Sequence, residues 1–148
     1  MIRQQKGSQS IEFAMVLIPF LLLFIGFFEI SRVLLVSAIF ESAVNAGVRE
    51  VRVLPQGLRA EQTFRDEIDQ FPMLDVDNLT ITATGYGVSL NDIANVVPVL
   101  KRDATLAEYQ ITYNYELVIL PGLSDYFSDS IDDMTELNRR VLVSYDNK

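Results

Sequence analysis

Hydrophobic and polar positions divide this 148-residue chain into an apolar N-terminal segment and a polar remainder. Residues 13–28 are sixteen positions without a polar side chain, and twelve of them are Leu, Ile, Val or Phe. On a membrane-insertion scale those twelve contribute about −4 to −7 kcal/mol, which outweighs the cost of an acid at the edge such as Glu12. Together with the apolar residues that follow, the pattern predicts a bilayer-spanning helix over about residues 12–36.

The helical pattern continues beyond the apolar segment, but with a narrower apolar face. Five hydrophobic residues recur at helical spacing: Val33, Phe40, Val44, Val48 and Val51. Residues 55–57, Pro-Gln-Gly, are a stop signal. We therefore predict one helix over residues 8–54, roughly 70 Å long. This length is about twice the thickness of a bilayer, so the amphipathic half of the helix, residues 37–54, must project from the membrane.

Residues 55–148 carry the periodicities of a small α+β head. A second amphipathic helix is expected at residues 59–71. Period-two alternation predicts three strands, with a turn after the first: residues 79–84, 109–120 and 138–146, the turn being 85–87. The expected fold class is α+β and pilin-like, with the long helix packed on a three-stranded antiparallel sheet. The tyrosines of the middle strand are interpreted as sheet core rather than a ligand platform.

Composition excludes several classes of function. Asp and Glu outnumber Lys and Arg by 20 to 12, and the net charge of −8 argues against a nucleic-acid binder. Cysteine and histidine are absent, which removes disulfides, thiolate chemistry, histidine bases and histidine zinc sites. We expect no enzymatic activity, no cofactor and no metal.

An acidic segment near the C-terminus is the one candidate for metal chemistry. Its acids are oxygen ligands suited to calcium: Asp125, Asp129, Asp132, Asp133 and Glu136. No Asp-Xaa-Asp-Xaa-Asp-Gly loop is present, and runs of acids are usually solvated surface. Solvated surface is the favoured interpretation of this segment, and a calcium site is the weaker one. For the whole protein, a membrane-anchored carboxylate enzyme or ligand-binding module is a less favoured alternative.

The N-terminal flank decides orientation and processing. Arg3 and Lys6 precede the apolar segment, and no acid lies before Glu12, so the N-terminus is expected in the cytoplasm. A cleaved signal peptide is disfavoured because the apolar stretch is too long, although residues 36–38 resemble its cleavage site. A plain signal anchor and a specifically processed anchor remain.

The junction at residues 6–13, Lys-Gly-Ser-Gln-Ser-Ile-Glu-Phe, resembles a type IV prepilin processing site. The resemblance implies that a prepilin peptidase cuts between Gly7 and Ser8, with Glu12 and Phe13 as recognition residues. Residues 1–7 would then be a cleaved basic leader. It also implies that the new amine at Ser8 pairs with Glu12 of a neighbouring subunit and sets axial register.

Three segments extend this likeness: residues 11–19, 26–32 and 41–49. They resemble the TadE/TadF-like pseudopilins of the tight-adherence (type IVb, Flp) pilus system. Pro19 lies one residue further from Glu12 than the family pattern has it, which leaves TadE and TadF open, and it is expected to kink the helix.

The resemblance implies a minor pilin in the bacterial inner membrane, with a periplasmic head, that takes part in pilus assembly or priming for adhesion and biofilm formation. The expected partners are the prepilin peptidase, other pilin subunits, the inner-membrane assembly platform and the lipid bilayer. The alternative is a membrane-retained accessory of the pilus or secretion machinery that does not polymerise.

Overall fold

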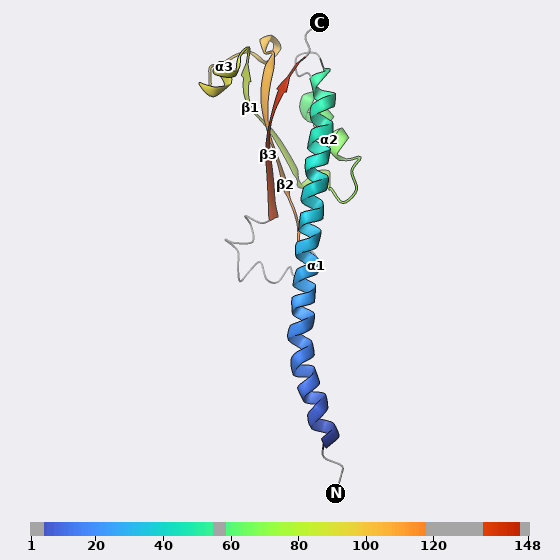
Figure 1. Cartoon of the computed structure of the whole chain (residues 1–148). Helices are drawn as coiled ribbons and strands as arrows, with labels where there is room; N and C mark the ends of the chain where they lie inside the picture. The colour runs from blue at the N-terminus through green and yellow to red at the C-terminus, as the bar shows by residue number, and fades with distance from the viewer. Residues whose placement is uncertain (1–4, 55–58, 118–134, 146–148) are drawn as a thin grey trace.

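The structure, a computed structural model, describes residues 5–54, 59–117 and 135–145. A long helix extends downward from a small head (Figure 1). Within the head, the upper part of this long helix and a second helix pack on one antiparallel sheet. The main elements are α1 (Gln5–Arg52), α2 (Ala60–Ile68), β1 (Leu79–Gly87), α3 (Leu90–Ala94), β2 (Leu106–Asn114) and β3 (Glu136–Ser144). Two short 3-10 helices, η2 (Val76–Asn78) and η3 (Lys101–Asp103), precede β1 and β2. The predicted fold class is confirmed.

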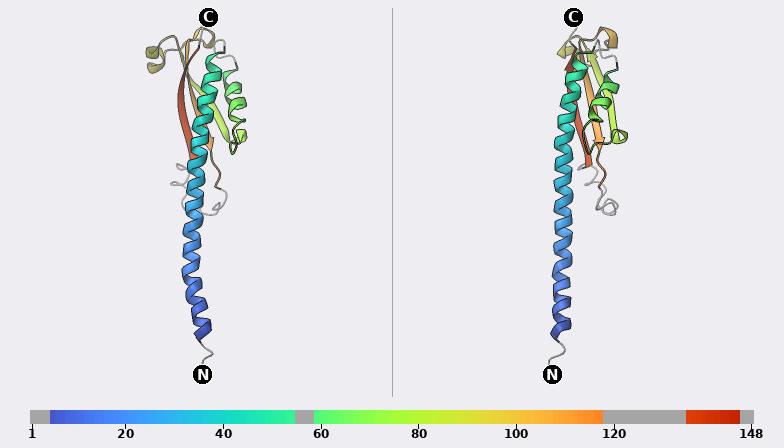
Figure 2. Two further views of the ribbon diagram at one scale, coloured as in Figure 1. Left: turned by 45° about the vertical axis from the view of Figure 1, so that its right-hand side comes forward. Right: turned by 90° about the vertical axis from the view of Figure 1, so that its right-hand side faces the viewer.

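The upper half of α1 forms one layer of the head with α2, and the sheet forms the other (Figure 2). The strands lie in the order β1-β2-β3, each antiparallel to its neighbour. Within the helix layer, α1 lies over β3 and α2 lies over β1. The apolar stripe predicted on α1 faces the core of the head, since Phe40, Val44 and Val51 are buried there.

Alternation along β2 builds the centre of the core. Its inward residues Ala107, Tyr109 and Ile111 are fully buried, and Tyr113 nearly so. Aromatic rings connect this strand to both helices. Phe64 of α2 lies 5.4 Å from Tyr109 between ring centroids, and Phe40 of α1 lies 5.9 Å from Tyr113. The tyrosines of β2 are therefore sheet core, as the alternation indicated.

The predicted turn at residues 85–87 is wrong. β1 continues to Gly87, whose partner on β2 is Leu106. The register shifts between Ala83 and Gly85, so one extra residue is accommodated as a bulge rather than a turn. The hydroxyl of Thr84 donates to the carboxylate of Glu108 across this irregularity, at 2.7 Å. Glycine near a bulge looks like a turn in sequence, which explains the error.

Two strand boundaries also differ from the prediction. β2 begins three residues earlier than expected, because Leu106 and Ala107 continue the alternation and pair with β1. It ends at Asn114, before the predicted end at residue 120. β3 spans residues 136–144 rather than 138–146, although Val143 and Tyr145 are buried on its inner side as expected. Residues 118–120 of the predicted middle strand lie outside the described residues, as does residue 146.

Candidate membrane-anchoring site

The lower half of α1 carries a long, exposed apolar surface that the head does not cover (Figure 1). Large hydrophobic side chains are exposed along it from Ile11 to Leu35. By length and composition, α1 is the one helix among the described residues that is suited to cross a membrane. At 1.5 Å per residue, residues 11–28 rise about 27 Å, close to a hydrocarbon core of about 30 Å.

The residues predicted for processing and recognition lie at the lower end of this surface. Glu12 is exposed, and Phe13 is 66% exposed beside it. The backbone of Gly7 and Ser8 lies in the first turns of α1. Peptidase cleavage at this junction stays a prediction.

Pro19 lies inside α1, and the helix runs through it. A proline in a helix removes one backbone hydrogen bond, and in a membrane neighbouring groups re-satisfy the freed carbonyl. The kink expected at Pro19 also stays a prediction.

The exposed surface ends on the head side at an acid. Glu29 is only 3% exposed, and the hydroxyl of Tyr115 donates to its Oε1 at 3.3 Å. The guanidinium of Arg32, one turn further along α1, lies 5.3 Å from the centroid of the Tyr115 ring. Burial raises the pKa of the Tyr115 hydroxyl above its ordinary value, so this group remains a hydrogen-bond donor at neutral pH.

Sequence reasoning found only part of this arrangement. Glu29 and Arg32 lie three residues apart in the sequence, a spacing that places both on one face of the helix. Tyr115 was recognised only as core, because nothing local connects it with a residue 86 positions earlier. The available signal was an acid interrupting an apolar run, since such an acid needs a partner from elsewhere.

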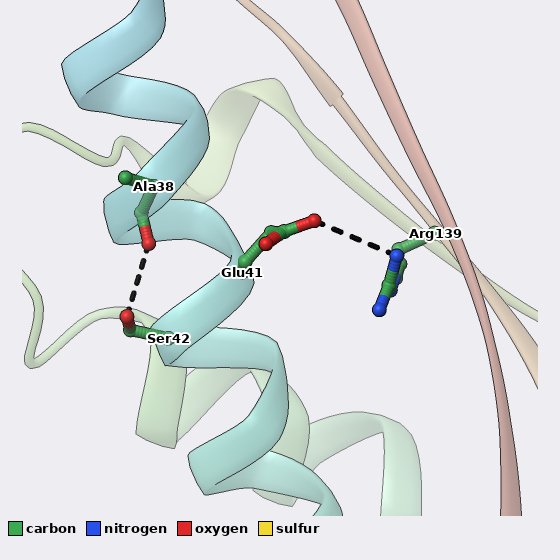
Figure 3. Close-up of polar contacts among 4 residues, drawn as sticks. All are labelled: Ala38, Glu41, Ser42 and Arg139. Carbon is green, nitrogen blue, oxygen red and sulfur yellow. Dashed lines mark hydrogen bonds and ion pairs between the residues drawn. The ribbon is translucent and has the colours of Figure 1, made fainter.

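An exposed ion pair joins α1 to the sheet higher up. Arg139 of β3 reaches Glu41 of α1 at 3.5 Å between Nη1 and Oε1 (Figure 3). Both side chains are more than half exposed, so the pair contributes little to stability. The next residue of α1, Ser42, donates its hydroxyl to the carbonyl of Ala38, one turn earlier in the same helix (Figure 3).

Two shallow hollows lie on the described surface of the head. One, of about 200 Å³, lies between β1 and α3 and is lined by Tyr86, Asp92 and Ile93 among others. Asp92 accepts hydrogen bonds from the backbone of Ser89 and Val88, which lowers the pKa of its carboxyl, so it serves as a helix cap. The other, of about 170 Å³, lies beside Glu41 and Arg139.

The described residues contain no cluster of three or more acids suited to a metal ion. Of the acidic segment singled out in the sequence, only Glu136 is described, at the start of β3. The remaining acids, at positions 125, 129, 132 and 133, lie outside the described residues. The calcium alternative therefore rests on the sequence alone.

Fold and site together define a class of protein: a small α+β head carried on a single helix suited to anchor it in a membrane. Within that class, residues 7–49 match the family model described as TadE-like protein. The match confirms the predicted TadE-like resemblance, and it indicates a protein associated with the Tad pilus. No curated protein and no solved structure matches the chain.

Proposed function

We propose that this chain is a minor pilin, or pseudopilin, of a tight-adherence pilus. In this proposal a prepilin peptidase cuts it after Gly7, and its apolar helix then joins or primes a pilus that serves adhesion and biofilm formation. The other pilin subunits and the inner-membrane assembly platform are its partners in that step.

One observation carries the proposal: α1 presents a continuous exposed apolar length that begins at an acid, Glu12, within a TadE-like segment. Cleavage creates a positive amine at Ser8, about 6 Å of helix rise from Glu12. An acid near apolar surroundings is costly unless it is paired. The amine of one subunit and the carboxylate of the next therefore set the register between neighbouring helices, as buried polar residues do in other bundles.

The local backbone at the proposed cut would favour proteolysis. Gly7 and Ser8 lie at the start of α1, where the first four backbone N–H groups of a helix have no intrahelical acceptor. Glycine further weakens a helix by about 0.5–1 kcal/mol relative to alanine. Opening this end into a protease cleft therefore costs little.

The proposed orientation follows from the charges that flank the span. Arg3 and Lys6 precede it, and the positive-inside rule keeps them in the cytoplasm. The head then lies in the periplasm, and the anchor is in the inner membrane. Protease added to intact spheroplasts is expected to digest the head; complete protection would reverse the orientation.

Processing is tested by the mass of the mature N-terminus in a host that has the pilus machinery. The expected chain begins at Ser8. Gly7→Arg is expected to abolish cleavage, because a side chain at this position obstructs close approach of the protease. Gln5→Arg is the matched control, since it adds the same charge two residues away and should be cut normally. A processed band of unchanged intensity in Gly7→Arg refutes the assignment of the site.

Assembly is tested by Glu12→Ala. The variant is expected to insert, because removing an acid favours insertion, but to appear at least tenfold less in sheared pili. Glu41→Ala, on the exposed outer part of the same helix, is the matched control and should assemble normally. Retention of the wild-type protein in the membrane fraction after shearing would instead favour the non-polymerising accessory.

A further inference from the structure

The apolar surface of α1 ends at different heights on its two sides. On the side that faces the head it stops at Glu29, which is 3% exposed. On the opposite side it continues past that level, with Ile30 54% exposed, Leu34 66% and Leu35 51%. Among the described residues, the part of the head that contacts Glu29 therefore lies at the same level as a bare apolar face of the helix.

The polar groups at this level are arranged to tolerate an apolar medium. The carboxylate of Glu29 is enclosed and accepts the hydroxyl of Tyr115. Arg32 lies with its guanidinium over the face of the same tyrosine ring, a favourable cation–π contact. On the bare side, Ser31 donates its hydroxyl to the carbonyl of Phe27 at 2.9 Å, so it adds no unsatisfied donor there.

Helix length places this level at the outer edge of a bilayer. Counted from Ile11, a hydrocarbon core of about 30 Å takes up about 20 residues and ends near Ile30. Leu34 and Leu35 then lie about 6 Å further out. With its polar layers a bilayer measures about 40–45 Å, so these leucines fall within the headgroup region.

We propose that the lower end of the head is seated in the outer interfacial layer of the bilayer, where Glu29, Arg32 and Tyr115 form a polar seam that fixes the depth of α1. The inference rests on the membrane anchoring in the proposed function and adds the depth at which the head sits. Lipid covers Ile30, Leu34 and Leu35 on the bare side, and the head covers Glu29 on the other.

Lipid fits this surface for two reasons. On the bare side, Ser31 is the one polar residue between Phe27 and Leu35, and its hydroxyl is bonded within the helix. This side is therefore continuous with the apolar surface of the membrane span. Arginine and tyrosine are also the side chains whose apolar bodies and polar tips suit a membrane interface. A second copy of the chain on the same face is the competing outcome of the test.

Because the chain has no native cysteine, a thiol-reactive label attaches only at an introduced cysteine. Nitroxide labels are attached in the full chain at Phe28→Cys, Leu34→Cys and Asn45→Cys, and the chain is reconstituted in vesicles of phosphatidylethanolamine and phosphatidylglycerol. Collision with oxygen reports lipid, and collision with a water-soluble nickel complex reports water. The label at position 28 is expected in the hydrocarbon, that at 34 at the interface, and that at 45 in water.

The seam is then tested by changing Glu29 in the Leu34→Cys background. Glu29→Leu joins the apolar segments on both sides of the acid, so the label is expected to sink by about one helical turn, roughly 5 Å. Glu29→Gln keeps a polar acceptor for Tyr115 and is the matched control, with an expected shift below half a turn. Near-ultraviolet circular dichroism of the tyrosines checks that the head remains folded.

If Glu29→Leu loses the tyrosine signal, the comparison is repeated with Tyr115→Phe, which keeps the ring beneath Arg32 and removes the hydroxyl. The label at position 34 should then move toward water, because the carboxylate loses the hydrogen bond from Tyr115 and water can replace it. No movement in the folded variant overturns the seam.

Three further results overturn the proposal. A label at position 34 as accessible to the nickel complex as that at 45 places the head clear of the membrane. A label shielded from both reagents indicates a second copy on this face. If the label at position 34 lies at the same depth in Glu29→Leu and Glu29→Gln, the acid does not fix the depth of α1. Vesicles that do not carry the chain at all refute the membrane anchoring itself, which is a failure of the proposed function.

Discussion

Gly47→Ala tests how closely α1 and α2 pack. A methyl group built on Gly47 would lie 2.5 Å from Cδ1 of Phe64 and 3.1 Å from Cε1, well inside van der Waals contact. Phe64 is fully buried, and its ring already packs on Tyr109. The ring therefore cannot move aside without displacing the sheet.

Two opposing effects set the magnitude. Alanine is better than glycine in a helix by about 1 kcal/mol. Overpacking a filled core costs about 1–3 kcal/mol. We expect the steric cost to win because the clash is with a side chain that has no free space, giving a net loss of about 1 kcal/mol. For a head of this size that lowers the melting temperature by roughly 4–8 °C.

The assay is thermal unfolding of the full chain in detergent micelles, followed by near-ultraviolet circular dichroism of the tyrosines. Gly26→Ala is the matched control, since nothing lies within 4 Å of a methyl group there and the head should melt as in the wild type. Phe64→Leu should partly offset the cost of Gly47→Ala, which gives a coupling above about 0.5 kcal/mol in a double-mutant cycle. Unchanged stability of Gly47→Ala, or strict additivity with Phe64→Leu, would refute the close-packing argument.

Further predictions concern the head. Burial, with the Tyr145 hydroxyl 2.6 Å away, raises the pKa of Tyr109 above its ordinary value of 10, so the stability from the protonated pair is complete below pH 10 and is lost above it. An absorbance titration should show these tyrosines ionising only as the head unfolds; ionisation near pH 10 in the folded head would contradict this. Val96 is 80% exposed at a φ of 53°, so Val96→Asn should raise the free energy of unfolding by about 1 kcal/mol in a urea titration, and a decrease would refute the strain. Arg139→Ala should change that free energy by less than about 1 kcal/mol, because its partner Glu41 is exposed; a larger loss would show a stronger pair.

Periodicity was sufficient for much of the architecture. The apolar run and the stripe containing Phe40 and Val44 are local patterns of 3.6-residue period, and they predicted a helix whose outer half packs on a head. Alternation along residues 109–113 likewise predicted a strand with its tyrosines inward. These features follow from the sequence because side-chain period alone decides which face of a helix or strand is apolar.

Strand ends and turns were predicted less well. Glycines at positions 85 and 87 favoured a turn, yet the strand continues through them with a bulge. Pairing with the neighbouring β2 decided this, because each residue of the continued strand gains a partner on β2. A local pattern does not contain that neighbour.

By itself, the sequence determined a membrane-suited helix, a polar α+β head and a TadE-like N-terminal segment. The tertiary structure alone decided where the apolar helix becomes part of the head. That boundary is set by Tyr115 meeting Glu29 from 86 residues away, while the bare side of the helix stays apolar to Leu35. The physical reason is that a charged group can be buried only where the fold brings distant side chains to it as partners. A contact between residues so far apart in the sequence leaves no periodic pattern along the chain.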